Sequence, residues 1–363
     1  MKHSFGSDNH SGVHPRILKA IERENSGFRV AYGDEDYTQK VLSSLENMLG
    51  GNCKAIFVFN GTGANIVSIA PFVKHYESVI CPSSAHIIVD ECGGPARYTG
   101  CEFFTVDCPD GKITAEQLRA QMPYEGSSDN DWHHAPKRIL SISQPTELGT
   151  IYTPDEIKEL ASIMHSHNGF LHMDGSRISN AAASLGMDIK EFTNYCGVDV
   201  LSFGGTKNGL LVGEAVVVFY GPNQNPRNKE IAMNELEYYR KQTTQLYSKN
   251  RFIAAQFEEY LKDNLYLEMA SHSNAMAQYL SKRLEEIPQI RISKKTESNA
   301  VFAILPKELC DKLLEKFYFY IWDESTYEVR WMCSFATRKE DIDEFIEAIK
   351  KNQYNFSSSL VNN

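Results

Sequence analysis

The first two thirds of the chain alternate between short apolar runs and longer amphipathic stretches. Short runs rich in β-branched and aromatic residues predict buried strands. One amphipathic stretch, Pro154–His167, predicts a helix, with Thr153 as N-cap and Glu156 as its capping-box partner. Strand–helix alternation predicts a layered α/β domain around a largely parallel sheet. The predicted strands are Ala55–Asn60, Ser78–Cys81, Cys101–Val106, Arg138–Ser143, Gly169–Met173, Val198–Phe203 and Glu214–Tyr220.

The pattern changes near Lys229, where a charged stretch with few turn signals predicts helical structure up to about Asn264. One further helix, at about Ser271–Glu286, then precedes four strand patterns and a final helix. Helices followed by a small sheet predict a separate α+β domain. We therefore expect a large domain at residues 1–248 and a smaller C-terminal domain at residues 249–363. The last strands and helix are expected at Ile290–Ser293, Ala300–Leu305, Phe317–Trp322, Glu328–Cys333 and Lys339–Lys351.

The composition narrows the class of protein. The chain has 363 residues, of which 42% are hydrophobic and 23% charged, as in soluble globular proteins. A net charge of −10 argues against a nucleic-acid partner, because proteins that bind nucleic acids carry basic surfaces. The opening residues lack the apolar segment of a secretory signal, and no apolar run is long enough to span a membrane. We therefore expect a cytoplasmic protein with reduced thiols and no membrane partner.

A glycine-rich turn follows the first predicted strand. Asn60–Asn65 reads Asn-Gly-Thr-Gly-Ala-Asn, so Gly61 and Gly63 leave the backbone open where a helix begins, and Thr62 adds a hydroxyl donor. Backbone N–H groups at a helix start bind anions. The alternative is a tight turn without a ligand. The glycine spacing matches neither a dinucleotide-binding loop nor a nucleotide triphosphate loop.

Two later strand ends carry an aspartate and a lysine. Asp174 ends the strand Gly169–Met173, at the edge where α/β sheets gather ligands. A helix cap is the alternative role for this aspartate. Lys207 lies in a loop after the predicted strand Val198–Phe203. Gly204, Gly205 and Gly209 in this loop leave room for a planar ligand. The alternative is a solvated surface lysine, as most lysines are.

Together, the turn, the aspartate and the lysine predict a site for pyridoxal 5'-phosphate (PLP). The amine of Lys207 can form a Schiff base with the cofactor aldehyde. The carboxylate of Asp174 can keep the pyridine nitrogen protonated, so that the ring withdraws electrons. The turn at Asn60–Asn65 can hold the phosphate.

With these motifs, the sequence resembles the low-specificity threonine aldolases, including phenylserine aldolases, among the fold-type I PLP-dependent enzymes. The resemblance implies a transferase-like α/β fold, a large PLP-binding domain with an N-terminal active-site segment, and a smaller α+β domain. It also implies retro-aldol cleavage of a β-hydroxy-α-amino acid, such as threonine, allo-threonine or phenylserine, to glycine and an aldehyde. The residues that carry it are Ser7–Asn9, Tyr32–Asp34, Asn60–Asn65, His86, Glu91–Gly94, His172–Arg177, Phe203–Gly209 and Arg330.

The resemblance assigns the cofactor contacts residue by residue. Lys207 would be the Schiff-base lysine, and Asp174 would pair with the pyridinium nitrogen. Arg177 would lie near the phenolic oxygen, and Gly61 with Thr62 would hold the phosphate. His86 would stack on the pyridine face as a catalytic residue. Without the resemblance, the sequence favours an ordinary loop histidine at this position.

Further residues would bind the substrate or come from a neighbouring subunit. Ser7 and Arg330 would bind the substrate carboxylate, since a guanidinium donates two hydrogen bonds to a carboxylate. Tyr32 would border the substrate pocket, with an ordinary core or turn tyrosine as the alternative. Lys249 and Arg251 are weaker candidates for phosphate contacts from a neighbouring subunit. The resemblance also implies a homo-oligomer, a homotetramer or dimer, with active sites between subunits.

One position departs from the expected family pattern. The loop Gln144–Thr150 has Glu147 where we expect a histidine, which leaves the catalytic base open. Glu147 either accepts the proton of the β-hydroxyl, directly or through a water, or only accepts a hydrogen bond from that hydroxyl or a loop amide, while water or phosphate transfers the proton. Neither histidine pair has the spacing of a metal site, so no metal is expected. The two pairs are His133–His134, in the predicted exposed loop Tyr124–His134, and His165 with His167.

Two other classes of function stay open from the sequence. The first is another PLP reaction on amino acids, either β-elimination or transamination. The second is a PLP-binding protein without catalytic activity, against which the presence of Lys207, Asp174 and Arg330 argues.

Overall fold

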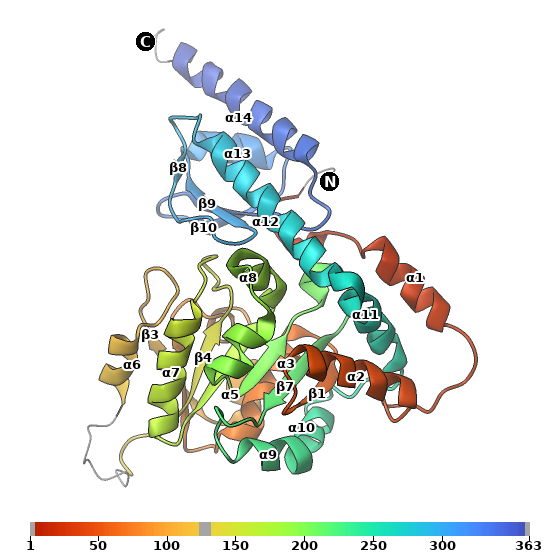
Figure 1. The fold of residues 1–363 in the computed structure, drawn as a ribbon. Helices are drawn as coiled ribbons and strands as arrows, with labels where there is room; N and C mark the ends of the chain where they lie inside the picture. Colours follow the sequence, from red (N-terminus) through yellow and green to blue (C-terminus); the bar gives the residue numbers. More distant parts are fainter. Residues whose placement is uncertain (1–3, 123–131, 360–363) are drawn as a thin grey trace.

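The computed structural model describes residues 4–122 and 132–359, and its large sheet has seven strands in the order β1-β7-β6-β5-β4-β2-β3 (Figure 1). The strands β2 to β6 run parallel to one another, whereas β7 is antiparallel to both β6 and β1. All seven predicted strands are present, with ends shifted slightly along the chain. Their bounds are β1 Cys53–Val58, β2 Ser78–Pro82, β3 Glu102–Val106, β4 Lys137–Ser143, β5 Phe170–Gly175, β6 Val200–Phe203 and β7 Glu214–Phe219.

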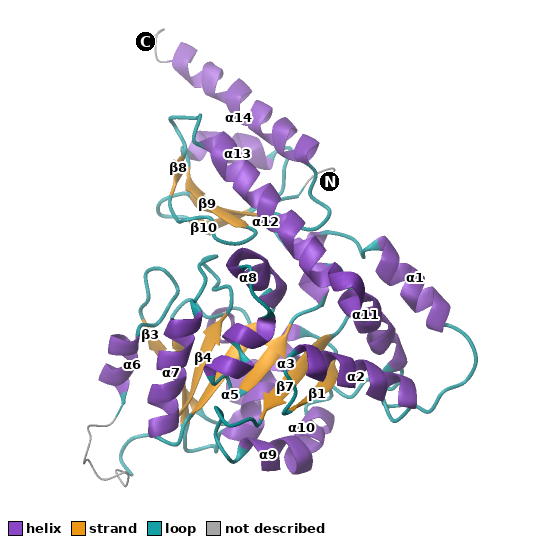
Figure 2. Ribbon diagram, in the orientation of Figure 1, coloured by secondary structure: helices purple, strands orange, loops and turns teal. Residues whose placement is uncertain are grey.

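Helices cover both faces of this sheet (Figure 2). Ala55 and Phe57 of β1 lie in one apolar core with α2, α7 and α11, while Ile56 and Val58 lie in the core shared with α3 and α10. Successive side chains of a strand point to opposite faces, so burial of both faces explains the continuous apolar runs in the sequence. The helices of the large sheet are α1 Pro15–Glu24, α2 Asp36–Met48, α3 Gly61–Ile69, α4 His86–Val89, α5 Gly94–Thr99, α6 Ala115–Gln121, α7 Pro154–Ser166, α8 Ile178–Leu185, α9 Asn228–Glu230, α10 Leu236–Gln242 and α11 Arg251–Leu261.

Two predicted helical regions have different outcomes. In α7 both capping-box hydrogen bonds are present, between Thr153 and Glu156, so the prediction from the capping pattern is confirmed. The charged stretch after Lys229 is not continuously helical, because the chain leaves the helix after Gln242 and returns only at Arg251. A charged pattern does not reveal such a break.

A second sheet of four antiparallel strands, β10-β11-β9-β8, packs against α12, α13 and α14. The boundary predicted near residue 248 stays a prediction. Within α12, buried apolar side chains up to Met269 belong to the core of the large sheet, and those from Ala277 onward belong to the core of the small sheet. The long helix α12 therefore runs from one core to the other (Figure 1). The elements are α12 Leu265–Leu284, β8 Arg291–Ile292, β9 Ala300–Ile304, α13 Lys307–Leu314, β10 Tyr320–Asp323, β11 Glu328–Met332 and α14 Lys339–Ser359.

The N-terminal segment joins these two cores. The ring of Phe5 is buried in the core of the small sheet. Its backbone N–H donates a hydrogen bond to the carbonyl of Tyr318, and its carbonyl accepts one from the N–H of Met332. Asp8, three residues later, reaches Arg177 beside the large sheet. Most of the predicted loop Tyr124–His134 lies outside the described residues. Among the helices that the structure describes, none is long and apolar enough to cross a membrane.

Candidate active site

Four of the sequence-predicted residues meet at one edge of the large sheet. The parallel strands β4, β5 and β6 end there. Asp174 is the second-last residue of β5, Glu147 and Lys207 follow β4 and β6, and the turn that contains Gly61 follows β1. Parallel strands deliver their carboxyl ends to the same edge, where α/β proteins bind ligands. The fold therefore brings the predicted lysine, aspartate and anion cradle to one place.

Asp174 is buried and held at both carboxylate oxygens. The Asn65 amide donates to Oδ2 at 2.9 Å, and the backbone N–H and hydroxyl of Ser176 donate to Oδ1 at 2.9 and 2.7 Å. Burial alone would raise the pKa of this carboxyl, but the charge of Lys207 and these hydrogen bonds together lower it below its usual value. Asp174 is therefore ionised at neutral pH.

Lys207 lies in a single 3₁₀ turn, Thr206–Asn208, directly after β6. The carboxylate of Glu214 accepts a hydrogen bond from the backbone N–H of Gly205 at 2.5 Å and so fixes the start of this turn. Burial, assisted by the positive charge of Arg177, lowers the pKa of Lys207 below its usual value. Gly204 is required next to this turn, because a Cβ there would lie 2.2 Å from the backbone oxygen of Ser176.

The turn before α3 fits a phosphate group. The side chain of Asn60 caps the helix by accepting from the N–H of Gly63 at 2.7 Å. Within the described part of the chain, the N–H groups of Gly61 and Thr62 make no hydrogen bond, and a Cβ on Gly61 would have Ser176 Oγ at 3.8 Å as its one neighbour. An amine-bearing lysine, an ionised aspartate and an open anion cradle match the aldehyde, ring nitrogen and phosphate of PLP.

Glu147 and His86 are in direct contact. Oε1 of Glu147 accepts from the His86 backbone N–H at 2.9 Å and from the Ser143 hydroxyl at 2.6 Å. Burial raises the pKa of Glu147, and the negative charge of Asp174 acts in the same direction. The imidazole of His86 lies 2.8 Å from Glu91, and this hydrogen bond raises the pKa of His86.

Two arginines and one carboxylate lie between the two sheets. Arg177 makes a bidentate ion pair with Asp8, with N···O distances of 2.6 and 3.0 Å. Arg330, on β11, has its guanidinium carbon 5.8 Å from the ring centre of Tyr320 and 4.9 Å from that of Trp322. Its Nε has no hydrogen-bond partner, and no carboxylate in the described residues pairs with it. Burial lowers the pKa of Arg330 to about 10.

Two guanidinium groups, of Arg177 and Arg330, stand against the single carboxylate of Asp8, so the local charge favours binding of one more anion beside Arg330. Ser7 directly precedes Asp8 and caps the short 3₁₀ turn Asp8–His10, because its hydroxyl oxygen accepts a hydrogen bond from the N–H of Asn9. A buried guanidinium without a carboxylate partner is unfavourable unless a ligand supplies the charge. This arrangement suits a carboxylate-bearing substrate.

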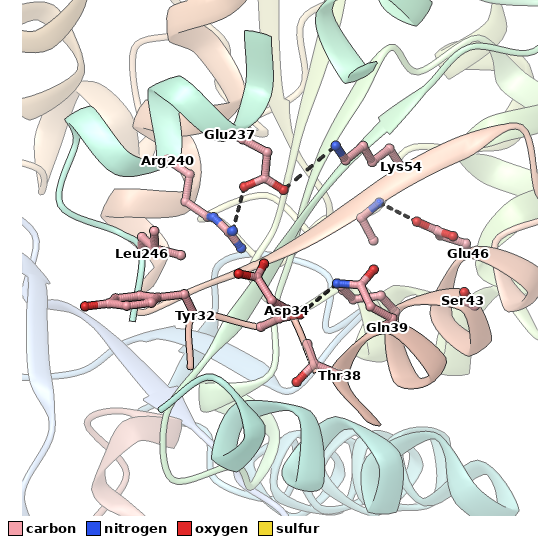
Figure 3. Close-up of a pocket in the computed structure, with 13 residues that line it drawn as sticks. Tyr32, Asp34, Thr38, Gln39, Ser43, Glu46, Lys54, Glu237, Arg240 and Leu246 are labelled. Carbon is pink, nitrogen blue, oxygen red and sulfur yellow. Dashed lines mark hydrogen bonds and ion pairs between the residues drawn. The ribbon is translucent and has the colours of Figure 1, made fainter. Parts of the chain in front are cut away.

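Three predicted residues do not join this group within one chain. Tyr32 lines a separate cavity of about 550 Å³ together with Asp34 and Arg240 (Figure 3). The ammonium of Lys241 lies 5.5 Å from the centre of the Tyr32 ring. Lys249 is exposed, and Arg251 bonds to the backbone of Ser26 and Gly27. Among the described residues, no group of three histidine, cysteine, aspartate or glutamate side chains could hold a metal ion.

Several residues of the site carry no role in the sequence prediction. These are Asp8, Asn65, Glu91, Ser143 and Glu214. Asp8 and Glu91 stand inside the stretches that carry the family resemblance, so their position is a signal in the sequence. Ser143 and Glu214 become visible only once strand ends are placed side by side.

This sheet topology, with a lysine, an aspartate and an anion cradle at one edge, defines a fold-type I PLP-dependent enzyme. Residues 4–307 match the beta-eliminating lyase family. The chain is 36% identical over 350 residues to the low specificity L-threonine aldolase of Pseudomonas sp. (strain NCIMB 10558), covering 95% of this chain and 96% of that protein. The Pseudomonas aeruginosa low specificity L-threonine aldolase is 35% identical over the same extent. A solved Leishmania major threonine aldolase has a TM-score of 0.87 at 28% identity, covering 96% of this chain and 99% of that one. The chain belongs to the beta-eliminating lyase family and groups with the low specificity L-threonine aldolases.

Proposed function

We propose that this protein cleaves a β-hydroxy-α-amino acid to glycine and an aldehyde with PLP as its cofactor. The observation that carries the proposal is the meeting of Lys207, Asp174 and the Gly61–Thr62 turn at one sheet edge, with Arg330, which has no carboxylate partner among the described residues, near Arg177. When bound, PLP supplies an electrophilic carbon and a ring that stabilises negative charge on the substrate Cα.

The chain's own groups prepare the cofactor site. The lowered pKa of Lys207 increases the fraction of neutral, nucleophilic amine at physiological pH. With PLP bound, ionised Asp174 would keep the pyridine nitrogen protonated, and Arg177 would lie near the phenolic oxygen. Gly61 and Thr62 would hold the phosphate, and His86 would stack on the ring.

Substrate binding falls to Arg330 and Ser7. The Arg330 guanidinium, flanked by two aromatic rings, pairs with the substrate carboxylate and neutralises its charge. Holding the carboxylate restricts rotation of the bound amino acid, and this restriction selects which bond at Cα is broken.

Glu147 removes the proton of the β-hydroxyl. Its Oε1 is occupied by Ser143 and the His86 backbone, which leaves Oε2 as the proton acceptor. A base whose pKa lies closer to neutrality is more effective at physiological pH, and burial raises the pKa of Glu147 in that direction. The proton moves to Oε2 as the Cα–Cβ bond breaks and the aldehyde leaves.

The protein is expected to act as a homo-oligomer, a tetramer or a dimer, in the cytoplasm. Tyr32, Lys249 and Arg251 lie away from Lys207 in a single chain, so a second subunit would have to bring them to the site. Phe28 and Val30, beside Tyr32, are exposed apolar side chains that an interface would cover.

A substrate screen tests the proposal. Threonine, allo-threonine, phenylserine and serine are each incubated with the PLP-loaded enzyme, and glycine, aldehyde, pyruvate, ammonia and ketoacids are measured. Glycine and an aldehyde in equal amounts support the proposal. Pyruvate with ammonia, a ketoacid, or no product from any of these substrates would overturn it.

A further inference from the structure

One side-chain amide joins two buried carboxylates behind the candidate active site. Asn65, on α3, donates from Nδ2 to Oε1 of Glu91 at 2.7 Å and to Oδ2 of Asp174 at 2.9 Å. A primary amide nitrogen carries two hydrogens, so it can serve both carboxylates at once. All three residues are at most 5% exposed.

The Glu91 carboxylate extends this chain of hydrogen bonds to His86. The distance from Nδ1 of His86 to the same Oε1 is 2.8 Å. An ionised carboxylate only accepts, so Nδ1 carries the hydrogen and the imidazole ring has one defined orientation. A continuous path therefore runs from His86 through Glu91 and Asn65 to Asp174.

The surroundings of His86 contain charges of both signs. Glu91 and Asp174 favour its protonated form, Lys207 disfavours it, and Glu147 accepts a hydrogen bond from its backbone. Since Glu91 makes the direct contact to the ring, its carboxylate has the largest favourable effect on the imidazolium.

A purely structural role does not account for Glu91. Its Oε2 and the Oδ1 of Asn65 are buried and have no hydrogen-bond partner. An incompletely paired buried carboxylate is costly, and a neutral side chain would fill the same space with less loss of hydration. The charge of Glu91 is useful only if it acts on a neighbour, and of the two side chains that bond to its Oε1, Asn65 and His86, His86 is the one that can take up a proton.

We propose that Glu91 and Asn65 are positioning residues that orient His86, favour its protonation and link it to Asp174. This inference rests on the proposed function, because the network joins His86, which would stack on the cofactor ring, to Asp174, which would pair with the ring nitrogen. Glu91 acts as the charged partner of the imidazole, as the aspartate does in hydrolase triads. Asn65 shares its two hydrogens between the carboxylates and so weakens each of them as an acceptor.

The test uses pH titrations of the PLP-loaded enzyme, followed by visible absorbance of the bound cofactor and by kcat/KM. The transition that disappears in His86→Asn is assigned to His86. In Glu91→Gln this transition should move to lower pH by about one unit or more, because loss of a nearby opposite charge lowers the pKa of a histidine. In Asn65→Ala it should stay or move to higher pH, because Glu91 becomes a stronger acceptor.

Ser68→Ala is the matched control. Ser68 is also buried on α3 and bonds to Ser202 at 3.0 Å, but it touches neither carboxylate. It should leave the transition in place. Thermal unfolding of all variants separates loss of stability from the titration.

The outcomes are distinct. An unchanged transition in Glu91→Gln, or an equal shift to lower pH in Asn65→Ala, would overturn the inference and assign the network a structural role. Failure of the proposed function looks different, because the wild-type enzyme would then lack aldol cleavage altogether.

Discussion

Oε1 of Glu147 accepts a hydrogen bond from the backbone N–H of His86, at 2.9 Å from nitrogen to oxygen. This contact joins the loop after β4 to the start of α4, so the proposed base and the proposed stacking residue hold each other in place. Movement of either segment would disturb both groups.

Replacement of Glu147 by glutamine keeps the shape of the side chain but removes its basicity. We expect kcat for aldol cleavage to fall by about 10²- to 10⁴-fold, as for loss of a general base. Exchange of the α-proton of glycine, which involves no β-hydroxyl, should persist. Cleavage that survives within a few fold, or equal loss of both reactions, would show that another group is the base.

The pH dependence of cleavage follows from the same residue. Burial raises the pKa of Glu147, so its carboxyl takes up a proton at higher pH than an exposed glutamate would. The wild-type rate should therefore fall as the pH decreases through this raised pKa, and Glu147→Gln should lack that acid limb. The measurement is kcat against pH for both proteins, with Glu116→Gln in the exposed first turn of α6 as a control. An acid limb that persists in Glu147→Gln contradicts the assignment.

Lys207→Ala should abolish activity together with the visible absorbance of the lysine–PLP Schiff base, because no other lysine stands at the carboxyl ends of β4, β5 and β6 in the described residues. The check is borohydride reduction followed by peptide mapping. A reduced cofactor adduct on a different lysine of the variant would contradict the assignment. Lys190→Ala, at an exposed ion pair with Asp188, serves as the control.

Arg330→Ala should raise KM for every amino-acid substrate by roughly 10- to 100-fold, since a hydrogen bond to a charged group contributes about 1.5–3 kcal/mol. The cofactor spectrum should not change, because the contact proposed for Arg330 is to the substrate carboxylate and not to PLP. Arg291→Ala, on the exposed strand β8, is the matched control. Weaker PLP binding with an unchanged KM would assign Arg330 to the phosphate instead.

The ion pair of Asp8 with Arg177 should stabilise the apo protein in a pH-dependent manner. Burial raises the pKa of Asp8, but Arg177 outweighs this effect and lowers it below 3.8. The stabilisation is therefore present above about pH 4 and is lost as the pH falls through the lowered pKa. Asp8→Asn should reduce the free energy of unfolding at neutral pH by about 3–5 kcal/mol, because it leaves a buried guanidinium unpaired. Urea unfolding at several pH values measures this, and an effect that is the same at pH 7 and at strongly acidic pH would contradict it.

Mixed oligomers test the placement of Tyr32. Tyr32→Ala and Lys207→Ala should each have little activity as pure proteins. If Tyr32 of one subunit completes the site of another, mixed oligomers of the two variants contain some sites with both residues intact, and activity should return. Mixed oligomers that form, as seen by native mass spectrometry, but stay inactive would place Tyr32 outside the shared site.

The strands of the large sheet could be predicted because burial on both faces makes them continuous apolar runs. The reversed direction of β7 could not, since Glu214–Phe219 is as fully buried and apolar as the parallel strands β5 and β6. The motifs around Asp174 and Lys207 were visible because each combines a strand end with residues of special conformation or charge. Partners from distant parts of the chain, such as Asp8 for Arg177 and Asn65 for Glu91, depend on how the elements pack, and no local pattern encodes that packing.

The residues between Phe5 and Asp8 span the gap between the two cores in very few peptide bonds. Phe5 is anchored in the small sheet that carries Arg330, and Asp8 is bonded to Arg177 beside Asp174. A displacement of the small sheet would therefore pull on the ion pair next to the cofactor site. Under the proposed function, a shift of the small sheet on capture of a substrate carboxylate at Arg330 would reach the charges beside the cofactor site through this short stretch of backbone.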